Sequence, residues 1–397
     1  MTHSDTSHIG QYSQPTVVDL FSGAGGTGLG FQKAGFHILG AVEINPNAAE
    51  TYERNLKVKV KRIDIRQLSP QAFGEELSLE QGDLDVLVGC PPCQGFSRMR
   101  NQKGREDKRN DLVLSYLEYV GELMPRFAVF ENVPGLVRTE HGRQFYEQLL
   151  EGLTRLGYSS VKQEEDVANY GIAQRRRRVV VIADRDKDTP SFPKHTHEKP
   201  GTSEFSTGMY RPWLTVWDVI GNGNYPSLKA GENGEQGDKY PNHVAPSISE
   251  KVLDFIRRVP QDGGSRKDVP KQFWLQCHLS HQGHADVYGR LAWNSLANTI
   301  TAGCTNLSKG RFVHPEQDRA LTPREAAALQ GFPNTFVFYG SDFSSQIGNA
   351  VPPPLAHAIA KLLRDLLCHE RVRKNTHTSP LEDIPRTSDV WDDKLDA

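Results

Sequence analysis

Short apolar runs alternate with amphipathic stretches through the first half of the 397-residue chain. Strands are predicted at residues 17–21, 37–42, 58–63, 84–88, 128–130 and 179–183, and helices follow the first of these to Gly35 and span 47–55 and 112–123. Strands that alternate with helices are typical of a mainly parallel sheet covered by helices on both faces. The pattern therefore predicts an α/β fold.

The pattern changes after about residue 188, where Pro, Gly, Asn, His and Trp become common and periodicity is lost until about residue 319. A capping box at Thr322 and Glu325 then predicts a helix to about Gln330, and a last helix is expected within 349–367. We therefore divide the chain into a flexible tail (1–14), a catalytic and cofactor-binding domain (15–188), a smaller irregular domain (189–318), a return to the catalytic domain (319–369) and a tail predicted to be disordered (370–397).

Composition narrows the class of protein. The formal net charge is −2, so any binding to nucleic acid must use local basic patches. Five cysteines, an odd number in a long chain, favour a reducing compartment over a disulfide scaffold. The sequence shows no apolar run long enough to cross a membrane and no signal-peptide pattern. We expect a cytoplasmic protein.

A glycine-rich turn follows the first predicted strand. The segment from Gly23 to Gly28 fits G-x-G-x-x-G, and Glu43, which ends the second strand, is the expected ribose partner. Any cofactor with an adenosine half, NAD included, could use this turn. Phe21 could stack on adenine, and Asp64, which ends the third strand, could accept a hydrogen bond from the adenine amino group. These two residues favour S-adenosylmethionine.

Cys93 lies in the segment Pro91-Pro92-Cys93-Gln94, directly after the strand predicted at 84–88. Ligands of open α/β sheets bind at strand ends, and a thiolate held there is a candidate nucleophile. A buried structural cysteine is the alternative. Cys90 and Cys93 also form C-x-x-C, which leaves a redox pair or half a zinc site open. We expect no metal, because the other ligand-like cluster matches no standard zinc pattern; it comprises Cys277, His278, His281 and His284.

Arg176 and Arg178 alternate before the strand predicted at 179–183, so their side chains are expected to share one face. Arg175 and Arg177 would point the other way, towards phosphate or solvent. In the irregular domain four tryptophans are expected to form the core rather than to stack on bases; they are Trp213, Trp217, Trp274 and Trp293.

Taken in order, six segments resemble the motif series of the DNA cytosine-5 methyltransferases, over about residues 16–365. They are Asp19-Leu20-Phe21-Ser22-Gly23-Ala24-Gly25-Gly26, Gly89-Cys90-Pro91-Pro92-Cys93-Gln94-Gly95-Phe96-Ser97, Glu131-Asn132-Val133-Pro134-Gly135, Gln174-Arg175-Arg176-Arg177-Arg178, Arg324-Glu325-Ala326-Ala327 with Gln330-Gly331-Phe332-Pro333, and Gln346-Ile347-Gly348-Asn349-Ala350-Val351-Pro352-Pro353. The resemblance implies a Rossmann-like methyltransferase sheet, with 189–318 as the target recognition domain. It also implies an enzyme of the bacterial or phage restriction-modification type.

By the same resemblance, a methyl group passes from S-adenosylmethionine to C5 of a cytosine flipped out of duplex DNA at a specific short sequence. Cys93 would add to C6, and Glu131, which follows the apolar run 128–130, would stabilise the ring at N3 through a protonated or hydrogen-bonding carboxyl. Arg178 would reach the base, with Arg176 nearby. The segment 94–109 would close behind the flipped base. Cofactor contacts are expected from Asp19, Phe21, Ser22, Gly23, Gly25, Gly26, Glu43, Ile44, Asp64 and Asn349.

Three rival functions stay open. A transfer RNA cytosine-5 methyltransferase has the same fold, although its Cys-Phe-Thr segment is not seen in this chain. A catalytically silent DNA-binding relative would not need Cys93, Glu131 and Arg178. An NAD oxidoreductase would have no use for Pro-Pro-Cys-Gln. The expected partners are duplex DNA and a restriction endonuclease that acts on the same site. We expect a monomer that is associated with the bacterial nucleoid through DNA.

Overall fold

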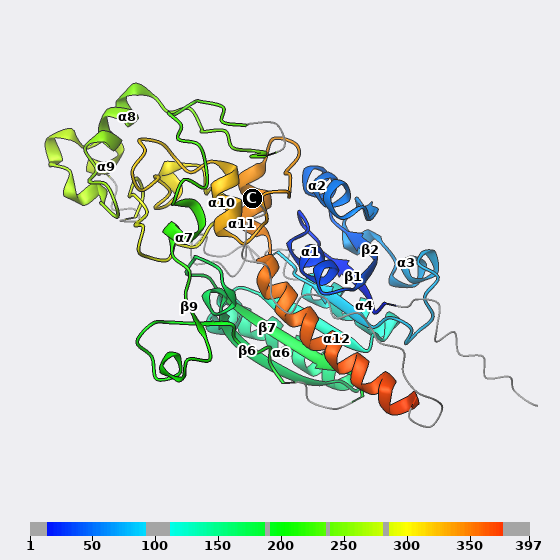
Figure 1. Cartoon of the computed structure of the whole chain (residues 1–397). Coiled ribbons are helices and arrows are strands. Elements are labelled where there is room, and N and C mark those ends of the chain that lie inside the picture. The colour runs from blue at the N-terminus through cyan, green and yellow to red at the C-terminus, as the bar shows by residue number, and fades with distance from the viewer. Residues whose placement is uncertain (1–13, 93–111, 187–190, 236–238, 281–285, 376–397) are drawn as a thin grey trace, which may run out of the picture. The chain divides into compact units, whose positions relative to one another are not determined.

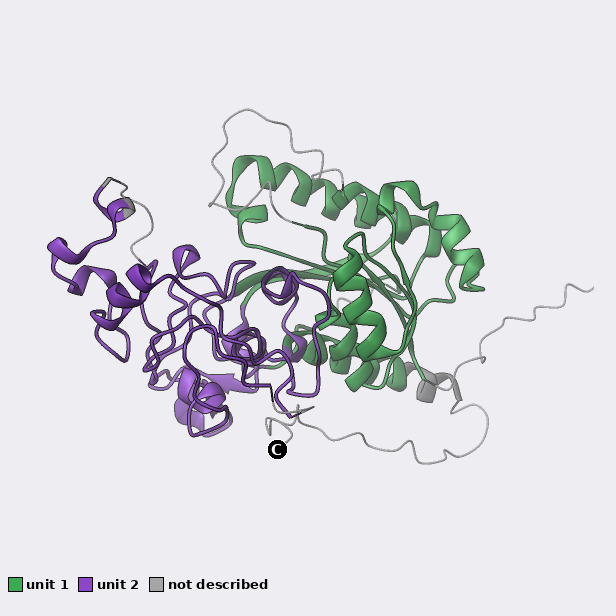
Figure 2. Cartoon of the chain, turned by 90° about the horizontal axis from the view of Figure 1, so that it is seen from above, with its two compact units in different colours: residues 1–165, 177–194, 355–389 green, residues 166–176, 195–354, 390–397 purple. Residues whose placement is uncertain are grey.

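The computed structural model describes residues 14–92, 112–186, 191–235, 239–280 and 286–375. By their contacts these residues divide into two compact units, which Figure 2 shows in green and purple. Unit 1 takes in the described residues within 1–165, 177–194 and 355–389, and unit 2 those within 166–176 and 195–354. The cysteine predicted as nucleophile and the segment 94–109 lie outside the described residues, as do the tails 1–13 and 376–397.

A seven-stranded sheet forms the centre of unit 1, in the order β3-β2-β1-β4-β5-β7-β6. Figure 1 labels β1, β2, β6 and β7 of this sheet. Strands β1 to β5 pair in parallel, and β7 runs antiparallel to β5. The predicted mainly parallel α/β sheet is therefore confirmed. The strands are β1 (Thr16–Leu20), β2 (His37–Val42), β3 (Val60–Lys61), β4 (Val86–Gly89), β5 (Phe127–Asn132), β6 (Ser159–Asp166) and β7 (Arg177–Asp184).

Helices cover both faces of the sheet. Val18 and Leu20 of β1 belong to a buried cluster that also contains residues of α4 (Leu112–Leu123), α6 (Glu140–Arg155) and α3 (Pro70–Glu76). Alternate residues of a strand point to opposite faces, and Asp19 accordingly meets α2 (Pro46–Leu56) on the other side. That second face also carries α1 (Gly26–Lys33) and α12 (Pro353–Asn375).

Close packing of α1 on α12 depends on a glycine. A Cβ atom added at Gly30 would lie 2.5 Å from Ala356 Cβ and 2.6 Å from the backbone nitrogen of His357. Further along the same helix pair, Arg364 donates to the carbonyl of Ala34 at 3.1 Å. Residues far apart in the sequence therefore complete one helical layer.

Several predicted boundaries were wrong. The helix α6 was missed, although Thr139 caps it and Leu149 and Leu153 are buried at helical spacing. The strand β6 was missed because its polar sequence shows no apolar alternation, and β3 pairs over two residues instead of six. The expected last helix is present as α12, but it continues to Asn375, so residues 370–375 are helical instead of part of a tail. The helix α11 (Phe343–Asn349), which precedes it, was missed.

Unit 2 has little regular structure. A cluster of buried apolar residues around Phe255 and Ile256 forms a hydrophobic core in this unit, and Trp274 packs against it. Trp293 is also buried, but Trp217 is 43% exposed, so the prediction that it lies in the core was wrong.

The remaining short elements are α5 (Gly135–Arg138) and η1 (Ile65–Gln67) in unit 1, and in unit 2 η2 (Val167–Tyr170), β8 (His197–Glu198), η3 (Phe205–Thr207), β9 (Arg211–Pro212), α7 (Val216–Ile220), α8 (Glu250–Arg257), η4 (Arg266–Asp268), η5 (Lys271–Phe273), α9 (Gln276–Ser280), η6 (Leu307–Lys309) and α10 (Pro323–Leu329).

The start of α10 confirms the predicted capping box of Thr322 and Glu325. Both terminal nitrogens of Arg319 donate to the Glu325 carboxylate, at 2.7 and 2.8 Å. Burial alone would raise the pKa of Glu325, but the charge and hydrogen bonds of Arg319 lower this pKa to about 2. Among the described residues, no helix is long and apolar enough to cross a membrane.

Candidate active site

Three neighbouring strands bring predicted site residues to one edge of the sheet in unit 1. Leu20 of β1 pairs with Gly89 of β4, and Gly89 pairs with Phe130 of β5. The carboxyl ends of these parallel strands therefore lie side by side, where open α/β sheets place their ligands. The residues that follow the three paired positions are Phe21, Cys90 and Glu131.

The turn after β1 has an unusual backbone. Phe21 has φ 56°, a left-handed conformation that is sparsely populated by residues other than glycine. Gly23 and Gly25 also have positive φ, and Gly25 is the N-cap of α1. Such strain is kept where the surrounding structure requires it, and it is common at ligand sites. The predicted glycine-rich turn is therefore present at the start of a helix.

Glu43 ties this turn to the next strand end. Its carboxylate accepts hydrogen bonds from the amides of Gly23 at 2.9 Å and Asn45 at 2.7 Å. Burial raises the pKa of Glu43, and the hydrogen bonds from the backbone amides oppose this effect. The neighbouring Ile44 is 64% exposed, which is unusual for a large apolar side chain. A fixed acid and an uncovered apolar surface thus adjoin the glycine turn.

Tyr52 of α2 supports the turn, and sequence reasoning missed it. Its hydroxyl donates to Asp19 Oδ2 at 3.2 Å, and both side chains are buried. A Cβ atom added at Gly28 would lie 2.4 Å from the tyrosine oxygen, so the glycine makes room for this ring. Burial, with the nearby charge of Glu43, raises the pKa of Asp19 to about 8. The acid before the glycine turn is therefore largely protonated at pH 7.

Two buried polar atoms at this turn lack partners within the described chain. Asp19 Oδ1 and the Ser22 hydroxyl accept or donate no hydrogen bond there. Buried polar atoms are normally satisfied, so a bound ligand is a natural partner for both. The third predicted acid is differently placed: Asp64 caps η1 and pairs with Arg66, with Nε 2.9 Å from Oδ1. These hydrogen bonds from Arg66 lower the pKa of Asp64.

The predicted catalytic carboxyl lies in a buried setting. Glu131 is 8% exposed at the end of β5, and Arg178 Nε of β7 lies 2.8 Å from its Oε1. This contact is a close ion pair rather than an aligned hydrogen bond, so Oε1 keeps hydrogen-bonding capacity. Next to it, Asn132 donates to the carbonyl of Pro91 at 3.2 Å. The end of β5 thus anchors the segment that leads to Cys93.

Cys90 lies between the glycine turn and Glu131. Its sulfur is 3.9 Å from the hydroxyl of Thr27 in α1. Burial, followed by the charges of Glu131 and Asp19, raises the pKa of the Cys90 thiol well above its ordinary value. A thiol in this state is a poor nucleophile. Cys90 is therefore not a candidate nucleophile.

Two predicted site residues belong to unit 2. Arg176 is buried, and its guanidinium donates to the carbonyls of Ile300, Gly348 and Ala350 at 2.8–3.0 Å. Asn349 is the last residue of α11, and its side chain is exposed. Whether these residues take part in catalysis or cofactor binding stays a prediction.

The cysteine and histidine cluster shows no ligand geometry in its described part. His278 packs against the rings of Tyr288 and Phe255, with centroids 4.8 and 5.3 Å away. Burial lowers its pKa. His281, His284 and the side chain of Cys277 lie outside the described residues. Within the residues that are described, no group of three or more His, Cys, Asp or Glu side chains could hold a metal ion.

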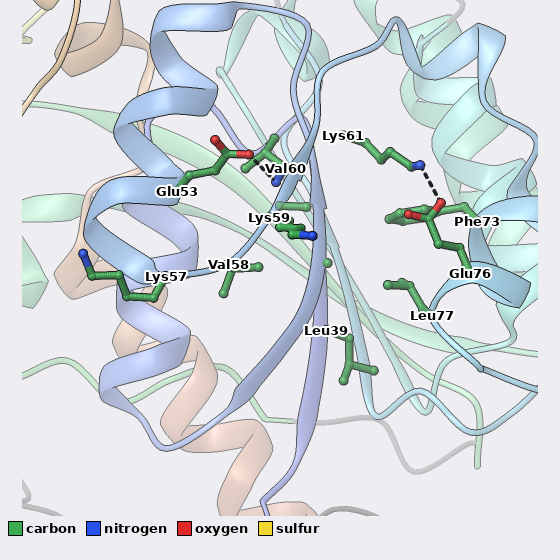
Figure 3. Close-up of a pocket in the computed structure, with 12 residues that line it drawn as sticks. Leu39, Glu53, Lys57, Val58, Lys59, Val60, Lys61, Phe73, Glu76 and Leu77 are labelled. Atoms are coloured by element: carbon green, nitrogen blue, oxygen red, sulfur yellow. Dashed lines mark hydrogen bonds and ion pairs between the residues drawn. The ribbon is translucent and has the colours of Figure 1, made fainter.

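A cavity of about 780 Å³ opens beside the edge strand β3 (Figure 3). Leu39, Phe73 and Leu77 contribute apolar surface, and Lys61 pairs with Glu76 at 2.6 Å. None of the described residues that line it is a predicted catalytic or cofactor residue. We therefore consider the strand ends, and not this cavity, as the candidate active site.

Comparison with known proteins places the chain among proteins of related sequence and fold. A family model described as "C-5 cytosine-specific DNA methylase" matches residues 15–364. The chain is 36% identical to type II methyltransferase M1.HphI of Haemophilus parahaemolyticus, covering 89% of this chain and 88% of the relative. It is 34% identical to type II methylase M.HgiDII of Herpetosiphon aurantiacus, covering 90% and 98%. In fold it is similar to the methyltransferase EhMeth of Entamoeba histolytica, with a TM-score of 0.59, 16% identity, and coverage of 90% and 99%.

Proposed function

The chain belongs to the C-5 cytosine-specific DNA methylase family, and from this premise we propose that Cys93, Glu131 and Arg178 carry the methyl transfer. It is a DNA (cytosine-5)-methyltransferase of the bacterial restriction-modification type, and S-adenosylmethionine is its methyl donor. The alternative of an NAD oxidoreductase is thereby set aside.

The residues at the glycine turn fit S-adenosylmethionine. Asp19 and Ser22 offer buried polar atoms that lack partners in the described chain, and Glu43 offers a fixed acid for the ribose. Phe21 and the exposed Ile44 offer apolar surface for adenine. When bound, S-adenosylmethionine supplies a methyl group on a positively charged sulfur. Further contacts are expected from residues that the sequence also predicted, namely Gly23, Gly25, Gly26, Asp64 and Asn349.

The chemistry begins with the thiolate of Cys93, which adds to C6 of a flipped-out cytosine. A bond forms between sulfur and C6, and negative charge spreads to N3 and O2 of the ring. Glu131 hydrogen-bonds N3, and the positive charge of Arg178 offsets the charge on the ring. C5 then accepts the methyl group and loses its proton to a base. The bond between sulfur and C6 breaks, and the thiolate leaves.

One observation carries this assignment: the buried Glu131 pairs with the partly buried Arg178 at the strand end, beside the segment that leads to Cys93. Serine is a much weaker nucleophile than a thiolate, so Cys93→Ser should lose methyl transfer. It should keep its affinity for S-adenosylmethionine, measured by calorimetry. Cys368→Ser replaces a free cysteine of α12 and should stay active.

A trapping experiment makes the test sharper. Fluorine at C5 of the target cytosine cannot leave as a proton, so the bond between sulfur and C6 should persist. Wild-type protein and Cys368→Ser should form a covalent complex with such DNA, visible on a denaturing gel. If Cys93→Ser also forms this complex, or turns over normal DNA, the nucleophile is misassigned.

We also propose that residues 189–318 form the target recognition domain, that the protein acts as a monomer in the cytoplasm, and that a restriction endonuclease shares its site. Mapping 5-methylcytosine at base resolution in cells that express the protein identifies the target sequence. Exchange of 189–318 for the same region of M1.HphI should then change the methylated sequence but not the chemistry. An unchanged target would contradict the assignment of this region.

A further inference from the structure

Arg176 was expected beside the base, but its surroundings in unit 2 suggest another role. We propose that Arg176 is a positioning residue. Together with Gln174 and Gln330, it holds two segments of unit 2 that are far apart in the sequence next to each other by hydrogen bonds. We call these three side chains the Gln174–Arg176–Gln330 clamp. All three are at most 2% exposed. The two clamped segments are residues 297–301 and 348–350.

The guanidinium of Arg176 joins both segments directly. Nη1 donates to the carbonyl of Ile300 at 2.8 Å, and Nη2 donates to the carbonyls of Gly348 and Ala350 at 3.0 Å each. An arginine has five N–H donors in a rigid fork, so these bonds use at least three of them. A group committed to three carbonyls in the interior is poorly placed to follow a substrate.

The two glutamines complete the clamp. Gln174 accepts from the amide of Ile300 at 3.1 Å and donates to the carbonyl of Leu329 and the side chain of Gln330 at 2.9 and 2.5 Å. Gln330 donates to the carbonyl of Ala350 at 2.7 Å. The Ala350 carbonyl therefore accepts from Gln330 and Arg176 at once, which couples these two side chains.

The backbone segments around the clamp also pack closely against one another. The amide of Arg175 donates to Ala297 at 2.8 Å, and the amide of Ala297 donates to Ala173 at 2.9 Å. A Cβ atom added at Gly348 would lie 2.0 Å from the carbonyl carbon of Thr301. The two segments therefore have little space to shift without breaking the bonds of Arg176.

The clamp would act through residues that adjoin it in the sequence. Asn349, the predicted cofactor residue, lies between the two clamped carbonyls of Gly348 and Ala350. Arg178, the predicted base contact, comes two residues after Arg176. The link from the clamp to catalysis rests on these proposed functions, whereas the clamp itself rests on the described contacts.

The test compares Arg176→Lys with Arg176→Met. A lysine keeps the charge but cannot reach three carbonyls, so both variants should loosen the clamp. We expect hydrogen exchange in 297–301 and 348–350 to rise about tenfold or more in both, because bonds to a charged donor are lost. KM for S-adenosylmethionine should rise more than kcat falls. Arg175→Lys, at an exposed neighbour, should leave exchange unchanged.

Each other outcome overturns the proposal. If exchange is unchanged in both Arg176 variants, the clamp does not hold these segments. If kcat falls with exchange and KM unchanged, or if lysine restores activity that methionine loses, Arg176 acts by its charge on the substrate. If exchange rises without any change of KM, the clamp is structural only and the positioning role is wrong.

Two further variants keep the test decisive. Gln330→Ala removes two bonds, the one donated to Ala350 and the one accepted from Gln174, and keeps the three bonds of Arg176. It should give a smaller change of the same kind, should Arg176→Met fail to fold. Cys93→Ser should lose methyl transfer but keep wild-type exchange in both segments. A failure of the proposed nucleophile is thereby distinguished from a failure of the clamp.

Discussion

The buried acid before the glycine turn gives the stability of this protein a pH dependence that can be measured. The pKa of Asp19 is raised from 3.8 to about 8 in the folded state, chiefly by burial. Because the pKa of Asp19 is higher in the folded than in the unfolded state, folding takes up a proton at any pH between 3.8 and about 8. The resulting stability is fully present below pH 3.8 and is lost as pH rises towards 8.

The size of the effect follows from the two pKa values. At pH 7 the unfolded chain holds Asp19 ionised, about three pH units above its ordinary pKa, and each unit costs about 1.4 kcal/mol, or about 4 kcal/mol together. Asn at this position resembles the protonated acid and can still accept from Tyr52. Asp19→Asn should therefore be more stable than wild type at pH 7, by up to about 4 kcal/mol, and about equally stable near pH 4.

The assay is chemical denaturation of both proteins from pH 4 to 8. The difference between their free energies of unfolding isolates Asp19 from the other titrating groups. Tyr52→Phe is the matched control: it removes a hydrogen bond that lowers the pKa of Asp19, so the loss of stability should extend to higher pH. If the difference between Asp19→Asn and wild type stays constant from pH 5 to 7.5, Asp19 does not titrate as argued.

The same acid should couple cofactor binding to a proton. S-adenosylmethionine is positively charged at its sulfur, and a nearby cation favours the ionised carboxylate. Binding at pH 7 should therefore release a proton from Asp19. Calorimetry in two buffers of different ionisation enthalpy measures this release, which Asp19→Asn should abolish. Equal proton release by the variant and wild type would place the proton elsewhere.

Three other measurements follow from the packing. Gly30→Ala forces α1 away from α12 and should destabilise the fold by about 1–3 kcal/mol, as measured by denaturation. In the control Gly121→Ala the added Cβ meets Leu156 Cδ2 at 3.5 Å, an ordinary contact, so α4 should be stabilised by about 0.5–1 kcal/mol, and equal effects of the two variants would contradict the packing argument. Burial lowers the pKa of His314 from 6.5 to about 4, so stability should fall by about 3 kcal/mol as pH drops from 6.5 to 4, and His314→Gln should lack this loss. Burial raises the pKa of Cys304 to about 12, so alkylation of the native protein followed by mass spectrometry should leave it unmodified.

The fold was predictable where the sequence carries strong local signals. The apolar runs of β1, β2, β4 and β5 are stable only when they are buried, which indicates central strands. The capping box at Thr322 marks the start of α10. The strand β6 escaped because its side chains are largely polar and it lies at the edge of the sheet. The register that aligns Phe21, Cys90 and Glu131 could not be derived from the sequence, because it is a property of the paired strands.

The supporting residues of the site escaped for a different reason. Tyr52 looks like an ordinary core residue of an amphipathic helix, and nothing local indicates that its hydroxyl meets Asp19. Arg176 stands among four consecutive arginines, and the sequence does not distinguish a guanidinium buried on carbonyls from one that contacts a substrate. Only long-range contacts separate these roles.

The packing of α12 on α1 has a consequence for synthesis of the protein. Gly30 is synthesised long before the helix that covers it. The ribosome must release α12 before the layer beside the glycine turn can close, so a nascent chain holds this half-finished face open to water and to chaperones.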